Sequence, residues 1–469
     1  MLDRFLKSLF LAVLGAFALN IGPVLAQGCE VQYQALVNLR SPFVGSYNVW
    51  DTVHGEIETD EAFKDGFTLE GSNNLYVVGT RIDKSKPDIK NILIVEVGRN
   101  GRVFWEEVHE VKGLSEIVRV IPHPKGAMVL ANIDLGEKRR KHAWLGVFDK
   151  RGALLSSKTL KDGNADLTAH DITPAGNGKS FVVAAFSQKE GSGQPGWSTV
   201  YRVNASGAVI SYQAFVIGAQ NAIYDLQTLK NGEFMATGYI HDAGGRKTGW
   251  IMRLADNLRM VWQRSYPRGA AAELVAGQQT IDNIFVAAGT ALPIGDGNRA
   301  TWVMTIDENS GDIGWQRYYS GELHFDGRDI LTNDDGMISV LMDGQTPKGS
   351  DVAEHVRLLT MNPRGVLFVS DEFFNGKGVD AHNLTSTPTG ERLIIGDTVL
   401  EHQIENVETG EFGPEMPKQD EGRVDEGEAV EEDGPVLEKS LQGWVVAFTG
   451  VDEYEDPCKP KLRTLPDER

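Results

Sequence analysis

The chain has 469 residues, of which 41% are hydrophobic, and its formal net charge is −20. Nucleic acids and anionic membrane surfaces attract clustered Lys and Arg, so this acidity argues against both as partners. Length alone would suggest two or three domains, because a chain of this size usually divides into more than one.

Residues 1–26 have the layout of a cleavable secretory signal peptide. Basic Arg4 and Lys7 precede an apolar run at 9–19, and a small-residue site at 24–26 stands just before Gln27. No other segment approaches the roughly 18 uninterrupted apolar residues of a membrane-spanning helix. We therefore expect a mature protein that begins near Gln27, is periplasmic or secreted, and has no integral membrane segment after signal cleavage.

The main body of the chain, residues 63–403, consists of sequence repeats. Seven β-rich apolar runs begin at nearly constant intervals, at Tyr76, Met128, Phe181, Phe234, Phe285, Ile338 and Leu393. A second series follows these runs at a shorter constant interval, except in the seventh repeat, where it is delayed to Trp444. Repeats of this length with room for four short strands are typical of propeller blades. The sequence therefore predicts an all-β protein, a seven-bladed β-propeller of four-stranded blades.

Two repeats carry a tryptophan four residues after a glycine (Gly101 and Trp105, Gly311 and Trp315), and repeat four has Trp262 with Leu258 in the glycine place. The fifth has Asp307, Gly311 and Trp315 in this spacing, and this resembles the tryptophan-docking motif of the quinoprotein-like (PQQ-like) or WD-repeat-like propeller family. The resemblance implies that each ring packs on the turn of the neighbouring blade. Ser156 and Ser211 replace tryptophan in repeats two and three. Adjacent cysteines, which hold the quinone in those enzymes, are missing here, so the resemblance implies the architecture and no cofactor.

Polar residues recur nine to eleven positions before the second strand of most repeats. They are Arg119, His170, Asp171, Tyr224, Asp225, Arg328, Asp329, His382 and Asn383. If these residues lie on the innermost strands, they form a ring at the mouth of the central channel. They are then either contacts for a small ligand, an ion or a peptide end, or structural groups whose aspartates cap turns between blades. Repetition of Asp from blade to blade is also what a structural role predicts.

An acidic insert, residues 404–438, interrupts the seventh repeat between its second and third strands. It contains 13 Asp or Glu against Lys418 and Arg423. Segments of this composition are usually solvated and disordered, but a lid, a weak calcium-binding loop and a docking segment for a basic partner are alternatives. Its carboxylates do not have the spacing of a dedicated calcium loop.

Residues 439–469 complete the last blade, which lacks an outermost strand. The N-terminal segment 27–62 can supply that strand, and we assign it to Val31–Leu39. Cys29 and Cys458, the two cysteines of the chain, flank this closure, so we expect a disulfide between them in an oxidising compartment. Two unpaired thiols are the alternative.

Common catalytic motifs are missing from the sequence, including a nucleophile elbow, a zinc-binding helix and a phosphate-binding loop. We assign no catalytic residue and leave the metal content open. The main hypothesis is an exported, non-catalytic binding or scaffold protein of the bacterial envelope that contacts a protein, a small molecule or a carbohydrate at the channel mouth. The alternative is a hydrolase or lyase acting on carbohydrate or peptide in the central funnel, where two carboxylates would suffice.

Overall fold

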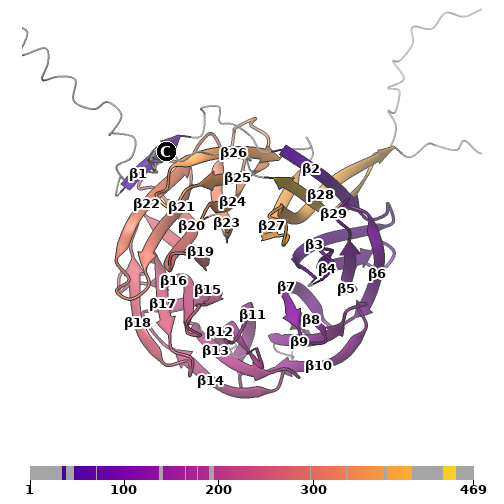
Figure 1. Cartoon of the computed structure of the whole chain (residues 1–469), viewed down its shortest axis with the longest axis horizontal. Coiled ribbons are helices and arrows are strands. Elements are labelled where there is room, and N and C mark those ends of the chain that lie inside the picture. The colour runs from indigo at the N-terminus through magenta and orange to yellow at the C-terminus, as the bar shows by residue number, and fades with distance from the viewer. Residues whose placement is uncertain are drawn as a thin grey trace, which may run out of the picture.

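The computed structural model describes residues 34–38, 47–403 and 437–449, except residues 70, 137–140, 164, 177, 190–194, 296, 334–335 and 374–377. It is a ring of seven β-sheets around a central channel, and every described element is a strand (Figure 1). The predicted seven-bladed propeller is confirmed. The signal peptide, both cysteines and most of the acidic insert lie outside the described residues.

Blades one to four each have four antiparallel strands in chain order from the centre outwards. Blade one contains β3 (Thr59–Thr68), β4 (Leu75–Asp83), β5 (Lys90–Val97) and β6 (Val103–Glu110). Blade two contains β7 (Leu114–His123), β8 (Gly126–Asp134), β9 (Lys141–Asp149) and β10 (Leu154–Leu160). Blade three contains β11 (Ala165–Pro174), β12 (Ser180–Lys189), β13 (Trp197–Asn204) and β14 (Val209–Phe215). Blade four contains β15 (Gln220–Thr228), β16 (Phe234–His241), β17 (Lys247–Leu254) and β18 (Met260–Tyr266).

Blades five to seven keep this pattern, and the N-terminal segment adds a strand to blade five and to blade seven. Blade five contains β19 (Ala271–Gln279), β20 (Ile284–Leu292), β21 (Ala300–Asp307) and β22 (Ile313–Ser320), with β1 (Gln34–Asn38) added outside β22. Blade six contains β23 (His324–Thr332), β24 (Ile338–Gln345), β25 (His355–Met361) and β26 (Leu367–Phe373). Blade seven contains β27 (Val379–Ser386), β28 (Arg392–Gln403), β29 (Leu437–Thr449) and, outermost, β2 (Tyr47–His54).

The hydrophobic core lies between blades rather than inside any one sheet. Second strands such as β8 are buried almost throughout, because both faces of a blade pack against neighbours. Val182 and Ala184 of blade three, for example, belong to one buried cluster with Ile223 and Phe234 of blade four. Because both faces of these second strands are buried, their side chains are apolar without interruption, and these are the apolar runs that recur along the sequence.

The ring is closed by an N-terminal strand, as predicted, but at a different place in the sequence. The strand that pairs with β29 is β2, so the assignment to Val31–Leu39 is wrong. Part of that run forms β1, which pairs in parallel with β22 on the outside of blade five (Figure 1). Both segments are β-prone, and only the packing of the blades decides which of them closes the ring.

Tryptophans on outer strands pack on the turns of the next blade. Trp315 donates its indole N–H to the Pro363 carbonyl at 2.7 Å, and its ring lies over Gly365. Trp262 makes the same bond to the Glu308 carbonyl at 3.0 Å. Leu258, which stands in the glycine place of repeat four, has a φ of 66°, a left-handed conformation that normally favours glycine. The packing implied by the resemblance is therefore present between these blades.

No helix with the length and apolar character needed to cross a membrane occurs among the described residues.

β28 and β29 are the second and third strands of blade seven, and their pairing extends to Gln403 and Leu437. The acidic insert therefore leaves blade seven beyond the point where the inner strand β27 begins. We call the end of the ring at which the inner strands begin the mouth.

Candidate functional site: the central channel and the closing seam

Every inner strand contains a β-bulge, an extra residue that locally turns the strand. The register shifts by one residue at Lys64, Val118, His170, Tyr224, Val275, Arg328 and His382. Bulges re-aim side chains and are common beside functional sites. Because the bulge recurs at one level in all seven blades, the residues that follow it form a ring within the channel.

This ring, which we call the carboxylate ring, consists of Asp65, Arg119, Asp171, Asp225, Ala276, Asp329 and Asn383. It lies midway along the inner strands rather than at the mouth. Five of its members were sequence candidates, whereas Asp65 and Ala276 were missed. In repeat one the pair Lys64-Asp65 is followed by Gly66, whereas the sequence pattern that marks the other ring residues is a polar pair followed by an aliphatic residue.

Each aspartate of the ring accepts a hydrogen bond from the backbone of the next blade. The N–H of Val120 donates to Asp65 at 2.6 Å. Equivalent bonds reach Asp171 from Leu226 at 2.7 Å, Asp225 from Gly277 at 3.0 Å and Asp329 from Leu384 at 2.8 Å. The expected capping of turns between blades is therefore replaced by a different structural role: these carboxylates join neighbouring inner strands inside the channel.

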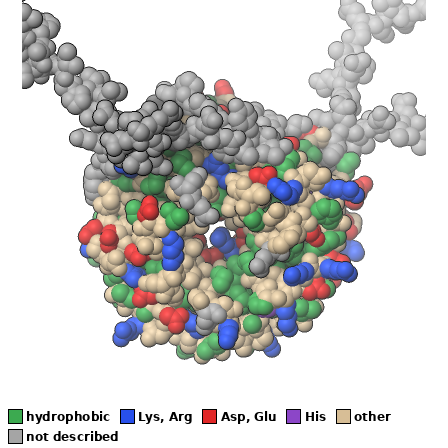
Figure 2. Space-filling model, in the orientation of Figure 1, with side chains coloured by type: hydrophobic (Ala, Val, Ile, Leu, Met, Phe, Trp, Pro, Cys, Tyr) green, Lys and Arg blue, Asp and Glu red, His purple; other side chains and the backbone are tan. Residues whose placement is uncertain are grey.

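Arg119 is the cation of the ring. Its Nε lies 3.5 Å from Asp65 Oδ2 and 3.5 Å from Asp171 Oδ1, and its side chain is 34% exposed. Burial alone would lower the pKa of Arg119, but the carboxylates around it raise that pKa above its usual value. Figure 2 shows the hollow at the centre of the molecule, with charged side chains of both signs around it.

The four aspartates are buried, and burial raises their pKa values. The pKa of Asp65 and that of Asp171 rise from 3.8 to about 6, although Arg119 opposes the shift. For Asp225, burial and the neighbouring Asp171 raise the pKa well above 3.8, and burial also raises that of Asp329. The protonated form of these carboxyls is thus favoured by burial, because full ionisation of all four around one guanidinium would leave uncompensated negative charge in the channel.

The bulge residues themselves form a second layer of polar and aromatic groups. The His170 and Tyr224 rings stack with centroids 5.2 Å apart, and Tyr224 also contacts Tyr239 at 5.5 Å. The Lys247 ammonium lies 4.4 Å from the Tyr239 ring centroid and is paired with Glu273. Burial lowers the pKa of His170 to about 4, so its imidazole is neutral at physiological pH.

The remaining candidates are paired within their own blades. Arg328 donates to Asp343 at 2.8 Å, and His382 donates to Asp397 at 2.8 Å. Arg328 remains 37% exposed and Asp380, close to His382, remains 46% exposed. The structure therefore divides the sequence candidates into a buried carboxylate ring and a more accessible layer of bulge residues.

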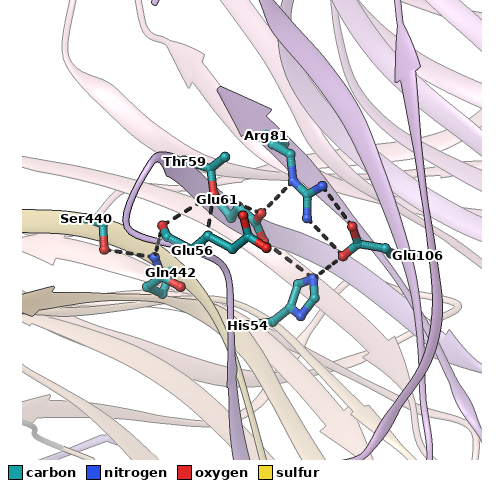
Figure 3. Close-up of polar contacts among 8 residues, drawn as sticks. All are labelled: His54, Glu56, Thr59, Glu61, Arg81, Glu106, Ser440 and Gln442. Carbon is teal, nitrogen blue, oxygen red and sulfur yellow. Dashed lines mark hydrogen bonds and ion pairs between the residues drawn. The ribbon is translucent and has the colours of Figure 1, made fainter. Parts of the chain in front are cut away.

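A further polar cluster, not found from the sequence, lies at the seam where blade seven meets blade one (Figure 3). His54 of the closing strand donates to Glu106 at 2.8 Å and lies 3.5 Å from Glu61, whose side chain is fully buried. Arg81 donates to Glu61 at 2.5 Å and to both oxygens of Glu106 at 2.9 Å. Hydrogen bonds from Arg81 lower the pKa of Glu106.

The seam cluster fastens the ring closed, because its members come from the outermost strand of blade seven and from three strands of blade one. Gln442 adds to it by donating to the Glu56 carbonyl at 2.9 Å. The chain carries only one such seam, so the repeat gave no signal for it. Among the described residues, no group of three or more His, Cys, Asp or Glu side chains is arranged to hold a metal ion.

No protein-family model matches the chain, and no curated protein matches it. Among solved structures, it is similar to a Penicillium chrysogenum α-L-arabinanase complexed with arabinobiose, with 9% identity, a TM-score of 0.46, and coverage of 70% of this chain and 100% of that one. It is also similar to a Mycobacterium tuberculosis puromycin-hydrolyzing peptidase, with 12% sequence identity and a TM-score of 0.45, and to a Pyrococcus horikoshii acylaminoacyl peptidase, with 10% sequence identity and a TM-score of 0.40. Each similarity covers 72% of this chain. The chain spans about half of each peptidase, 49%. Likenesses at this level assign no activity.

Proposed function

We propose that the protein is an exported, non-catalytic binding or scaffold propeller of the bacterial envelope, with the mouth of the channel as its contact surface. The observation that carries this proposal is the bonding of the carboxylate ring. Asp65, Asp171, Asp225 and Asp329 each accept a backbone N–H from the next blade. A carboxylate that accepts a backbone hydrogen bond from the next blade has a structural role in joining the two blades, and that oxygen is not available to bind a substrate.

The contact surface is assigned to the mouth because accessible charge lies at the mouth and just inside it. Asp380, the second residue of β27, is 46% exposed, and Arg328, midway along the adjacent inner strand β23, is 37% exposed. Polar and charged groups at the rim of an interface steer a partner and set its orientation. A rigid ring presenting these groups suits a platform for a protein or for a small polar ligand such as a carbohydrate.

Site-specific photo-crosslinking in the native bacterium tests this assignment. A photoreactive residue at Asp380 is compared with one at Phe104, which is 55% exposed on the outer strand of blade one. The proposal expects one discrete crosslinked product from position 380, with a protein or a carbohydrate identified in it by mass spectrometry, and none from position 104. No product from position 380, or the same products from both positions, would overturn it.

One observation favours the alternative, an enzyme acting on carbohydrate or peptide. Burial and the neighbouring Asp171 raise the pKa of Asp225 well above 3.8, and Asp225 shares the channel with Arg119, whose side chain is partly exposed. A carboxyl whose pKa is raised by burial is suited to act as a general acid. Hydrolysis of p-nitrophenyl glycosides and peptide p-nitroanilides by the wild type, abolished in a folded Asp225→Asn variant, would establish this alternative and refute the non-catalytic assignment.

A further inference from the structure

The ring residue of blade seven, Asn383, differs in its bonding from the aspartates of the carboxylate ring. Each of those aspartates accepts the N–H of the residue that follows the ring position in the next blade, as Asp329 accepts from Leu384 at 2.8 Å. For Asn383, the equivalent donor in blade one is Gly66. Gly66 donates instead to Asp65, its own neighbour, at 2.9 Å. The donor that would satisfy Asn383 is therefore engaged elsewhere.

The side-chain oxygen of Asn383 is left without a donor. The side chain is 5% exposed, and among the described residues nothing donates a hydrogen bond to its Oδ1. Its Nδ2 donates to Asp329 Oδ2 at 3.3 Å, so the amide lies within the ring. Buried polar atoms without a partner are rare in native proteins, and each one calls for a bound water, an ion or a ligand. The ring therefore holds an acceptor for a donor that the described residues do not supply.

This part of the ring is also short of positive charge. Arg119 forms ion pairs with Asp65 and Asp171, each at 3.5 Å. Among the residues that the structure describes, Asp329 forms hydrogen bonds but no ion pair. Burial raises the pKa of Asp329, although Arg119 opposes the shift. A cationic donor beside Asn383 would complement both the unpaired oxygen and the charge of this carboxylate.

A cationic group can reach this point from the mouth. The channel is open to solvent at the level of the ring, since the side chain of Arg119 is 34% exposed there. Asp380 lies three residues before Asn383 on β27, nearer the mouth, and is 46% exposed. Arg328, the cation on the adjacent inner strand, is paired with Asp343 at 2.8 Å. An approaching cation therefore meets a carboxylate before it reaches the ring, which favours its entry.

We propose that the channel binds a primary ammonium group, which donates a hydrogen bond to Asn383 Oδ1 and is stabilised by the charges of the neighbouring ring residues, Asp329 and Asp65. An ammonium is a compact charge with rotatable donors, so one fixed acceptor can orient it, whereas a guanidinium needs a planar, two-oxygen partner. A metal ion suits the site less well, because among the described residues no group of three or more His, Cys, Asp or Glu side chains could hold one.

The ammonium can belong to a lysine side chain, to the N-terminus of a partner chain or to a small alkylamine. Its remaining N–H groups stay hydrated, because the channel is open to solvent at this level. Binding in this way rests on the proposed role of the mouth as the contact surface.

Calorimetric titration of the purified mature protein with n-butylammonium chloride tests the site. Saturable binding is expected at about pH 7.5, and none for tetraethylammonium chloride, which has the same charge but no N–H to donate. Asn383→Leu removes the acceptor and should weaken binding about tenfold or more, because hydrogen bonds to charged groups are the strong ones. Asn383→Asp keeps the shape and adds a carboxylate, so it should strengthen binding. The matched control Asn257→Leu, in an exposed turn of blade four, should leave binding unchanged.

Proton release is a second readout of the same titration. Because the ammonium favours ionised carboxylates, its binding should release protons to the buffer and should be weaker at about pH 5 than at about pH 7.5. Glycylglycinamide distinguishes the sources, since its amine belongs to a chain N-terminus. Tighter binding of this probe than of n-butylammonium assigns the site to an N-terminus, and weaker binding assigns it to a lysine side chain or an alkylamine.

Three results would overturn the proposal: no binding of either amine, equal binding of tetraethylammonium, or the same affinity in the wild type and in both Asn383 variants. None of them depends on the crosslinked product from position 380, which tests the contact surface separately. Failure of the ammonium site and failure of the proposed function are therefore distinguishable.

Discussion

Neutralising Asp65 should flatten the dependence of folding stability on pH. The carboxyl is 3% exposed, and burial raises its pKa from 3.8 to about 6 despite Arg119 beside it. In the unfolded chain this group titrates near its ordinary value, so between about pH 4 and pH 6 the folded state binds more protons than the unfolded state. Stability from this group is therefore fully present below about pH 4 and is lost as the pH rises through about 6.

The magnitude follows from the shift. About two pKa units at roughly 1.4 kcal/mol each correspond to a loss of about 3 kcal/mol in the free energy of unfolding from Asp65 alone. Asp65→Asn removes the titration, so the difference in stability between about pH 4 and about pH 7.5 should be smaller in the variant by about this amount. The amide cannot accept from both Val120 and Gly66 as the carboxylate does, but that cost is the same at every pH and cancels in the comparison.

Urea denaturation followed by tryptophan fluorescence, at several pH values in this range, measures both profiles. Asp312→Asn is the matched control, because this carboxylate is 67% exposed and hydrogen bonds from Ser310 and Arg264 lower its pKa. The control should not flatten the profile. If wild type and Asp65→Asn give parallel profiles from about pH 4 to about pH 7.5, burial does not perturb Asp65 and the account of the ring is wrong.

Three further predictions concern the ring, the blade contacts and export. Arg119→Met leaves the buried carboxylates without their cation, so we expect the free energy of unfolding to fall by about 3 to 5 kcal/mol near neutral pH and by less near pH 4. Urea titrations measure both values, and equal losses at the two pH values would contradict this prediction. Trp315→Ala, at a 3% exposed position, should lower the free energy of unfolding by about 3 to 5 kcal/mol, whereas Phe104→Ala, at an exposed position, should lower it by less than about 0.5 kcal/mol. Equal decreases in the thermal unfolding temperature of the two variants would show that the docking of Trp315 contributes no stability. Mass spectrometry of the exported protein should give an N-terminus at Gln27 and a Cys29–Cys458 disulfide; a retained Met1 or two free thiols would refute those assignments.

The candidate site was only partly predictable from sequence. The recurrence of Asp171, Asp225 and Asp329 at one point of the repeat marked the level of the ring, since a repeat places equivalent residues at equivalent positions. It did not show that each carboxylate bonds to the next blade, because that bond depends on the bulge that turns the side chain. The seam cluster of His54, Glu61 and Arg81 occurs once, and a search for repetition therefore passed over it.

The sequence by itself determined the fold. Apolar β-rich runs recur at a nearly constant interval that is typical of four-stranded propeller blades, and seven such blades packed face to face close a ring. Tertiary structure decided which N-terminal segment completes blade seven. Residues 31–39 and Tyr47–His54 are both suited to an edge strand, but β2 brings Trp50 against Gly101 and His54 against blade one. Local propensity cannot distinguish two edge strands, because the difference lies in contacts with residues far away in the chain.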